Sequence, residues 1–308
     1  AERKTSVKKK KVGAQELFFD MLKERAETGR IYIMNIDHCN EHSSFKDRVL
    51  MSNLCQEITL PTDPIQHIDG EGEIALCILS AINVGRINYI DDLESLCDLA
   101  VRALDEIIDH QKYPVKAAEI STKARRSLGI GYIGLAHYLA KSKVSYEDKA
   151  AWKEVDELTE AFQYYLLKAS NELAKEKGPC DYFNRTKYSD GILPIDTYKK
   201  EVDEIVNRKL SMKWEQLRKS IKENGLRHST LSAQMPSESS SVVSNATNGI
   251  EPPRDYLSVK KSKKGTLKQI VPDYQRLKNY YTLLWDMKGN TGYINIVAVM
   301  QKYFDQAI

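Results

Sequence analysis

Three side chains with different chemistry occupy alternate positions around residue 55. Asn53 supplies an amide, Cys55 a thiol and Glu57 a carboxylate. In an extended segment alternate side chains point the same way, so the pattern predicts that all three line one side of a pocket. A negative charge near a thiol disfavours the thiolate, so Cys55 is better suited to losing a hydrogen atom than a proton. The carboxylate can then act as a general base on a neighbouring hydroxyl, while a buried structural cysteine is the plainer alternative for a lone thiol.

A second thiol, Cys77, lies in the nearly continuous apolar run of residues 73–85. Such runs favour strands that are buried on both faces, as in parallel sheets covered by helices. Taken from the residues alone, Cys77 is a core cysteine.

Residues 236–241, with the sequence PSESSS, form a hydroxyl-rich segment after a stretch that reads as extended. Serine is a preferred helix cap and proline is favoured in the first turn, so a helix is predicted to begin here. Hydroxyls and free amides at a helix start can hold a phosphate without lysine or arginine. An ordinary serine-rich cap is the alternative.

Other patterns are rejected. Residues 129–134 match GxGxxG literally, but no buried strand is predicted before them, so close helix packing is favoured over dinucleotide binding. Residues 38–42 (HCNEH) lack the second ligand pair that structural zinc requires and are predicted to form a polar loop. The tyrosine pairs at 164–165 and 280–281 fall in amphipathic patterns and are interpreted as packing residues.

The elements that must position these groups alternate between helices and short apolar strands, which predicts an α/β fold. Apolar residues recur at spacings of three and four in the predicted helices, at residues 14–28, 90–112, 152–177, 214–224, 272–287 and 293–306. Strand character is expected at 31–35 and within 73–85, and residues 227–235 are expected to be extended. Residues 14–308 are predicted to form one domain behind a basic tail or junction at residues 1–13.

Composition narrows the classes of function. The chain has 308 residues, a net charge of +3 and apolar runs far too short to span a bilayer. Five cysteines at irregular spacing argue against a secreted disulfide framework, so a reducing cytoplasm is expected. The lysine run at residues 8–11 is interpreted as a solvated tail rather than a nucleic-acid arm.

Long motifs give the sequence a specific resemblance. MSNLCQEITLPT, GEIALCILSAINVGRIN and LRHSTLSAQMPSESSSVVSNATNGIEPPR occur in that order, with YYLLKASNELAKEKG and GILPIDTYKK between the last two. Together they resemble the large subunit of class I (aerobic) ribonucleotide reductase, from about Arg25 to the last residue. The resemblance covers less than half of a typical member of that family.

The resemblance implies a role for each motif. It implies part of a ten-stranded α/β barrel with a central finger loop, on which Cys55 becomes a thiyl radical and abstracts the 3′ hydrogen of a ribonucleotide. Glu57 matches the base on the 3′ hydroxyl, and Asn53 matches the amide that orients the substrate hydroxyls. Cys77 matches one half of the reducing dithiol. The segment Ser237, Glu238, Ser239 and Ser240 matches the turn that holds the substrate diphosphate, with the Glu238 side chain expected to point away.

The same resemblance implies the partners. Ribonucleoside diphosphates are the substrates, a metal-containing small subunit supplies the radical, and an external thioredoxin- or glutaredoxin-type dithiol restores the thiols. No metal, membrane or nucleic-acid partner is expected for this chain, and the assembled large subunit is expected to be a homo-oligomer. Family parts without a match here are the regulatory N-terminal region, the first reducing cysteine and the C-terminal relay tyrosines. A truncated or split-gene product, inactive alone, is therefore expected, and a non-catalytic module that binds a complementary chain is the alternative.

Overall fold

The structure is a computed structural model that describes residues 8–65, 67, 72–262 and 265–308. The chain divides into two compact units, Ala1–Asn35 and Ile36–Ile308. The first unit contains helix α1 (Ala14–Thr28), as predicted, and Gly29 ends it in the left-handed conformation with φ of 65°. Residues 31–35 are irregular and do not form the expected strand.

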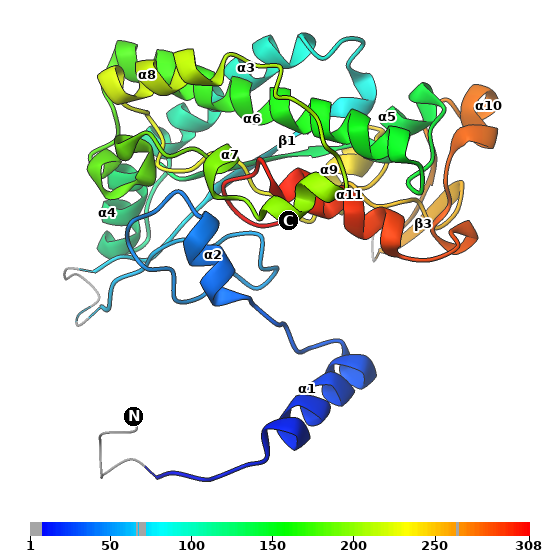
Figure 1. The fold of residues 1–308 in the computed structure, drawn as a ribbon, viewed down its shortest axis with the longest axis horizontal. Coiled ribbons are helices and arrows are strands. Elements are labelled where there is room, and N and C mark those ends of the chain that lie inside the picture. Colours follow the sequence, from blue (N-terminus) through cyan, green and yellow to red (C-terminus); the bar gives the residue numbers. More distant parts are fainter. Residues whose placement is uncertain (1–7, 66, 68–71, 263–264) are drawn as a thin grey trace. The chain divides into compact units, whose positions relative to one another are not determined.

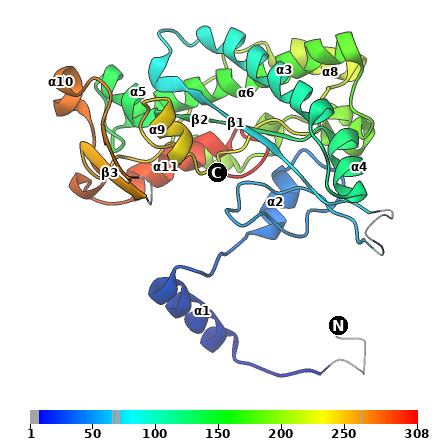
Figure 2. The ribbon, with the colours of Figure 1, turned by 180° about the vertical axis from the view of Figure 1, so that it is seen from behind.

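The second unit is organised around two parallel strands, β1 (Ile78–Asn83) and β2 (Leu128–Ile133). Ile78 lies opposite Leu128 and Asn83 opposite Ile133, and the two strands run side by side in Figure 2. Every residue of β2 is buried, whereas Leu79 of β1 is 43% exposed. A strand within residues 73–85 is therefore confirmed, but it is not buried on both faces as predicted.

An extended segment, residues 230–234, continues the sheet beyond β2. The amide of Leu128 donates to the carbonyl of Thr230 over 3.1 Å, and the amide of Ile130 donates to that of Leu231 over 2.8 Å. The amide of Ala233 returns a bond to the carbonyl of Ile130 over 3.2 Å. The prediction that this part of the chain is extended is confirmed.

Beyond the extended segment 230–234 come first residues 306–307 and then residues 57–59. The amide of Gln306 donates to Ser232, and the amide of Gln234 donates to the carbonyl of Ala307, both over 3.1 Å. The amide of Ala307 then donates to the carbonyl of Glu57 over 3.2 Å. We call the set of β1, β2, 230–234, 306–307 and 57–59 the central layer.

The glycines of residues 129–134 belong to this layer, which corrects the earlier interpretation of the motif. Gly129 and Gly131 lie within β2, so a buried strand contains the motif, and Gly134 (φ 82°) precedes α5 (Leu135–Ser142). A Cβ atom on Gly131 would come within 2.6 Å of the carbonyl oxygen of Ala233. Gly129 and Gly131 therefore allow neighbouring extended segments to approach closely, whereas Gly134 begins α5 beside the 3-10 turn that contains Gly85.

Long helices cover one side of β1 in both views (Figures 1 and 2). Helix α3 (Asp92–His110) packs against β1 and against α6 (Lys149–Lys177), and α8 (Trp214–Asn224) packs against α6. All three were predicted within a few residues. The other α-helices are α2 (Ile36–His42), α4 (Lys116–Arg125), α7 (Pro194–Thr197), α9 (Glu238–Val243), α10 (Tyr274–Leu277) and α11 (Thr291–Gln301).

Short 3-10 helices complete the connections, at Val84–Arg86, Phe183–Arg185, Lys187–Asp190, Lys200–Glu204, Lys278–Tyr280 and Leu284–Asp286. The single helix predicted at 272–287 is wrong, since α10 and two of these turns replace it. Asp273 adopts the left-handed conformation with φ of 52°, and the Tyr281 hydroxyl donates to the carbonyl of Pro272 over 2.7 Å. This tertiary bond folds the segment back on itself, which a continuous helix could not do.

A separate antiparallel hairpin pairs β3 (Leu257–Ser262) with β4 (Gly265–Ile270). Apolar residues such as Val259 and Leu267 are 48% exposed on it. In the part of the chain that the structure describes, the strands form this hairpin and the β1–β2 sheet and do not close into a barrel.

Candidate functional site

The loop that carries Cys55 is a tight turn rather than the extended segment predicted from the alternation of side chains. The amide of Gln56 donates to the carbonyl of Asn53 over 3.3 Å, and Gln56 has a positive φ of 67°. The Asn53 side-chain oxygen accepts from the backbone N–H of Ile58 over 3.1 Å. The backbone N–H of Asn53 donates to the carbonyl of Ile58, also over 3.1 Å. Asparagine side chains stabilise turns in this way because they replace a backbone acceptor.

This turn gives the three predicted residues different environments. Cys55 and Asn53 are exposed, whereas Glu57 is only 4% exposed. The Oε2 atom of Glu57 is buried and has no hydrogen-bond partner among the residues that the structure describes. Buried polar atoms in folded proteins nearly always have a partner, so this carboxylate oxygen is an exception.

Cys77 lies next to the stem of this turn. A Cβ atom on Gly129 would come within 2.9 Å of the Cys77 sulfur and within 3.2 Å of the Ile58 side chain. Burial raises the pKa of the Cys77 thiol, the charges of Asp305 and Glu57 raise it further, and a hydrogen bond from Gln306 opposes them. The structure therefore places Cys77 near Ile58, the residue that follows Glu57.

Asp305 organises the segment between the two candidate sites. Its fully buried carboxylate accepts hydrogen bonds from the amides of Leu231 and Ser232, over 2.9 and 2.8 Å, and from the Tyr188 hydroxyl over 2.7 Å. Burial raises the pKa of Asp305, and these donors oppose the rise. The predicted helix at 293–306 ends at Gln301 because residues 306–307 are held in the central layer instead. Asp305 and Gln306 were missed, and their only sequence signal was polarity at the end of an apolar segment.

The hydroxyl-rich segment does open a helix, α9, with Ser237 at its start. In the described part of the chain, the hydroxyls of Ser237 and Ser241 are buried without a hydrogen-bond partner. Glu238 is exposed and its carboxylate lies 3.4 Å from the Lys260 ammonium on β3. Lys260 also donates to the Ser239 hydroxyl over 3.5 Å. A lysine of the β3–β4 hairpin therefore lies beside the segment 236–241, whose sequence contains no lysine or arginine.

A cavity of about 450 Å³ lies beside this segment, and its lining includes Met235, Pro236, Tyr293 and Ile308. Pro236 immediately precedes the serines, and Ile308 follows the pair of residues hydrogen-bonded to Glu57 and Thr59. The predicted site residues do not themselves line this cavity, but two of its lining residues are next in sequence to Ser237 and to the pair bonded to Glu57 and Thr59.

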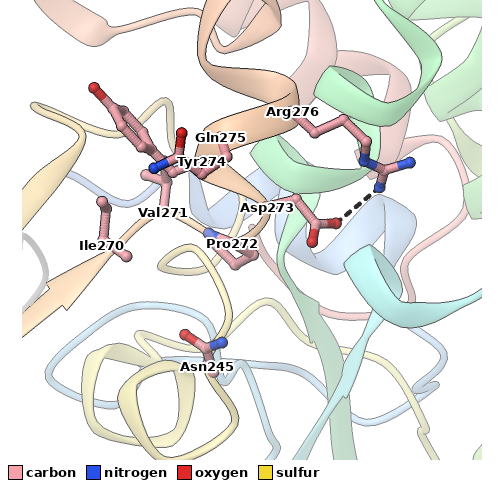
Figure 3. Close-up of a pocket in the computed structure, with 8 residues that line it drawn as sticks. All are labelled: Asn245, Ile270, Val271, Pro272, Asp273, Tyr274, Gln275 and Arg276. Carbon is pink, nitrogen blue, oxygen red and sulfur yellow. Dashed lines mark hydrogen bonds and ion pairs between the residues drawn. The ribbon is translucent and has the colours of Figure 1, made fainter.

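A second hollow, of about 430 Å³, is shown in Figure 3. Asn245 and residues 270–276 line it, and the Asp273 carboxylate pairs with Arg276 over 2.9 Å. None of the predicted site residues lines this hollow, so we assign it no part in the site.

The rejected patterns have structural explanations. Residues 38–42 lie in α2, which corrects the prediction of a loop. His42 contacts the carbonyl oxygen of Phe304 at 2.8 Å and the Thr197 hydroxyl at 2.9 Å, and burial lowers its pKa. The pair at 164–165 lies in α6 as expected, whereas the pair at 280–281 lies at the end of a 3-10 helix.

The fold and these groups define an α/β protein with an exposed free thiol, Cys55, two residues before a buried carboxylate, Glu57. All five cysteines are free. Among the described residues, no helix has the length and apolar character needed to cross a membrane.

Comparison with known proteins gives the family. The model of the family described as "Ribonucleotide reductase, barrel domain" matches residues 1–308, so the chain belongs to this family. It is 58% identical to ribonucleoside-diphosphate reductase 1 subunit alpha of Escherichia coli (strain K12), over 100% of this chain and 41% of that protein. The subunit alpha proteins of Haemophilus influenzae and of Enterobacteria phage T4 are 58% and 44% identical over the same shares. The chain thus spans 41% of the length of these relatives.

Proposed function

We propose that this chain carries the substrate-reducing site of a ribonucleoside-diphosphate reductase large subunit. In this proposal Cys55, as a thiyl radical, takes the 3′ hydrogen of the ribose. Glu57 accepts the proton of the 3′ hydroxyl, and Asn53 orients the substrate hydroxyls. The 2′ hydroxyl then leaves as water, and Cys77 with a second thiol supplies the reducing electrons and becomes a disulfide. Cys55 finally returns its hydrogen to the 3′ carbon, so one dithiol is oxidised for each deoxyribonucleotide formed.

We place the substrate diphosphate at the start of α9. Ser237, Ser239 and Ser240 would bind it through hydroxyls and amides, and Lys260 would lower the electrostatic cost of holding it beside Glu238. The buried hydroxyl of Ser237 supports this placement because it has no acceptor or donor among the described residues.

One observation carries the proposal: backbone hydrogen bonds link the segment that carries Glu57 to the segment that leads into the serines. Glu57 bonds to Ala307, Ala307 bonds to Gln234, and two residues after Gln234 the chain reaches Pro236. Gln234, Pro236 and Ile308, which lie on or next to this path, line the cavity of about 450 Å³. A cavity of this size is typical of small-molecule sites.

The partners follow from the same proposal. A radical-generating small subunit that contains a metal would supply the oxidising equivalent, and a thioredoxin- or glutaredoxin-type dithiol would reduce the disulfide. The central layer would form part of the wall of a ten-stranded barrel, and the Cys55 turn would be the tip of its finger loop. The subunit would act as a homo-oligomer in the cytoplasm, where five free thiols persist.

A second candidate function is an assembly module without chemistry of its own. Leu79 on β1 and Leu99 on α3 are 43% and 67% exposed, and a complementary segment that covered them would gain the free energy of removing apolar side chains from water. In this case the chain would bind a complementary large-subunit segment and contribute only structure.

The two candidates are separated by reconstitution with complementary large-subunit segments, the small subunit and a dithiol reductant. We expect the wild-type assembly to reduce ribonucleoside diphosphates, and the Cys55→Ala assembly to bind nucleotide normally but form no product. Cys39→Ala, which removes a thiol from α2, is the matched control and should retain turnover. Product formation by the Cys55→Ala assembly would refute the assigned chemistry, and an assembled but wholly inactive wild type would favour the assembly module.

A further inference from the structure

The Gln306 side chain makes contacts that the proposed chemistry has not yet used. It is 3% exposed and lies between the stem of the Cys55 turn and Cys77. Its Oε1 atom accepts from the amide of Thr59 over 3.2 Å. Its Nε2 atom donates to the carbonyl of Leu128 over 3.1 Å and lies 3.8 Å from the Cys77 sulfur.

These contacts use both ends of one amide group. The oxygen holds residue 59, two positions after Glu57, and the nitrogen holds the first residue of β2 and the thiol. The backbone amide of Gln306 also donates to Ser232 over 3.1 Å, so the side chain has little freedom to move. An amide is suited to this place because it donates and accepts at once without adding charge to a site that already holds Asp305 and Glu57.

We propose that Gln306 is a positioning residue that fixes the Cys77 thiol relative to the turn carrying Cys55 and donates a hydrogen bond to the Cys77 sulfur. This inference rests on the proposed function for the roles of the two thiols. It adds a residue that touches neither the reacting ribose nor the diphosphate and that acts through Cys77 and Thr59.

A hydrogen bond to sulfur stabilises the thiolate more than the thiol, so it lowers the pKa of the thiol. In Cys77 this effect opposes burial and the charges of Asp305 and Glu57. Removal of the donor should therefore raise the pH at which Cys77 becomes reactive. Removal of the acceptor should loosen the Thr59 amide.

The test follows alkylation of Cys77 in the 308-residue chain against pH by mass spectrometry, together with hydrogen exchange at the Thr59 amide. Gln306→Met removes the donor and the acceptor. We expect alkylation of Cys77 at a fixed pH to become about tenfold slower, which corresponds to a rise of roughly one unit in the pKa of its thiol. Exchange at Thr59 should become faster. Cys39, another half-buried thiol that Gln306 does not contact, is the reference in the same sample.

Gln306→Glu provides a second variant that keeps an oxygen acceptor for Thr59 and loses the donor to sulfur. It should slow alkylation of Cys77 at a fixed pH while leaving the Thr59 amide protected from hydrogen exchange. The buried thiols of Cys97 and Cys180 report unfolding, since they should stay unreactive in a folded variant. An unchanged rate of Cys77 alkylation at a fixed pH in a folded Gln306→Glu chain would overturn the inference. Because this readout needs no turnover, it stands or fails independently of the reductase activity.

Discussion

At the scale of single residues, Glu57 combines a proposed catalytic role with an unfavourable environment. Its carboxylate is buried, its Oε2 atom lacks a partner, and the turn beside it leaves Cys55 exposed. Such an arrangement costs free energy of folding, because burial removes water from a charged group without replacing its hydrogen bonds. A residue kept at such a cost is better explained by a bound substrate than by stability.

The substitution Glu57→Gln tests this explanation. We expect the free energy of unfolding in urea to rise by about 1 kcal/mol, because a neutral amide is easier to bury. In the reconstituted reductase, kcat should fall roughly 100- to 10,000-fold through loss of the general base.

Glu223→Gln is the control, since this carboxylate is 59% exposed beside Lys219 and should shift stability by less than about 0.5 kcal/mol. Clear destabilisation by Glu57→Gln would mean that the carboxylate has a structural partner in solution.

At the scale of elements, the central layer depends on how closely its strands approach. Gly131 of β2 faces the carbonyl oxygen of Ala233 and the side-chain oxygen of Gln234. The same segment, 230–234, is held on its other side by residues 306–307. A change in the spacing of β2 would therefore be transmitted to Gln306 and to Glu57.

Gly131→Ala should consequently destabilise the chain by about 1–3 kcal/mol, because the added Cβ would lie 2.6 Å from a backbone oxygen that cannot rotate away. Chemical denaturation measures the change.

Gly289→Ala is the matched control, because a Cβ at that position meets no atom within 4 Å, and it should change stability little. Equal effects of the two substitutions would show that strand spacing is not the cause.

At the scale of the whole second unit, buried histidines join segments that are distant in sequence. His42 contacts Phe304, His137 contacts Asp273, and His228 contacts Asp105. The pKa of all three histidines lies below the ordinary value, and burial is the largest cause of this shift in each. Each histidine is therefore favoured in its neutral form in the folded chain.

This predicts a fall in stability on mild acidification. The unfolded chain binds protons at the ordinary histidine pKa, near 6.5, before the folded chain does. The free energy of unfolding should therefore fall as pH drops below about 6.5, by at most roughly 1.4 kcal/mol per pH unit for each histidine. Urea titrations between pH 5.5 and 7.5 measure the slope, and His42→Gln should make it shallower. A flat profile over this range would contradict the assignment.

Local sequence patterns were sufficient to predict several helices, the strand β1 and the contiguous site motifs of this protein. The stripes of α1, α3, α6 and α8 and the apolar run around β1 repeat at the period of their elements, so side chains a few residues apart specify them. The motifs around Cys55, Cys77 and Ser237 were recognised for a similar reason, because each is contiguous in the chain. Family membership followed from those motifs and agrees with the comparisons.

Long-range contacts decided the features that the sequence patterns mispredicted or missed. Asn53 closes a turn with Ile58 where alternation predicted an extended segment, and Tyr281 folds back to Pro272 where periodicity predicted a helix. Gln306 lies 229 residues from Cys77, and no local pattern announces that one amide joins it to Thr59. Periodicity records which face of an element is apolar, whereas the partners of a buried polar atom depend on which distant segments pack beside it.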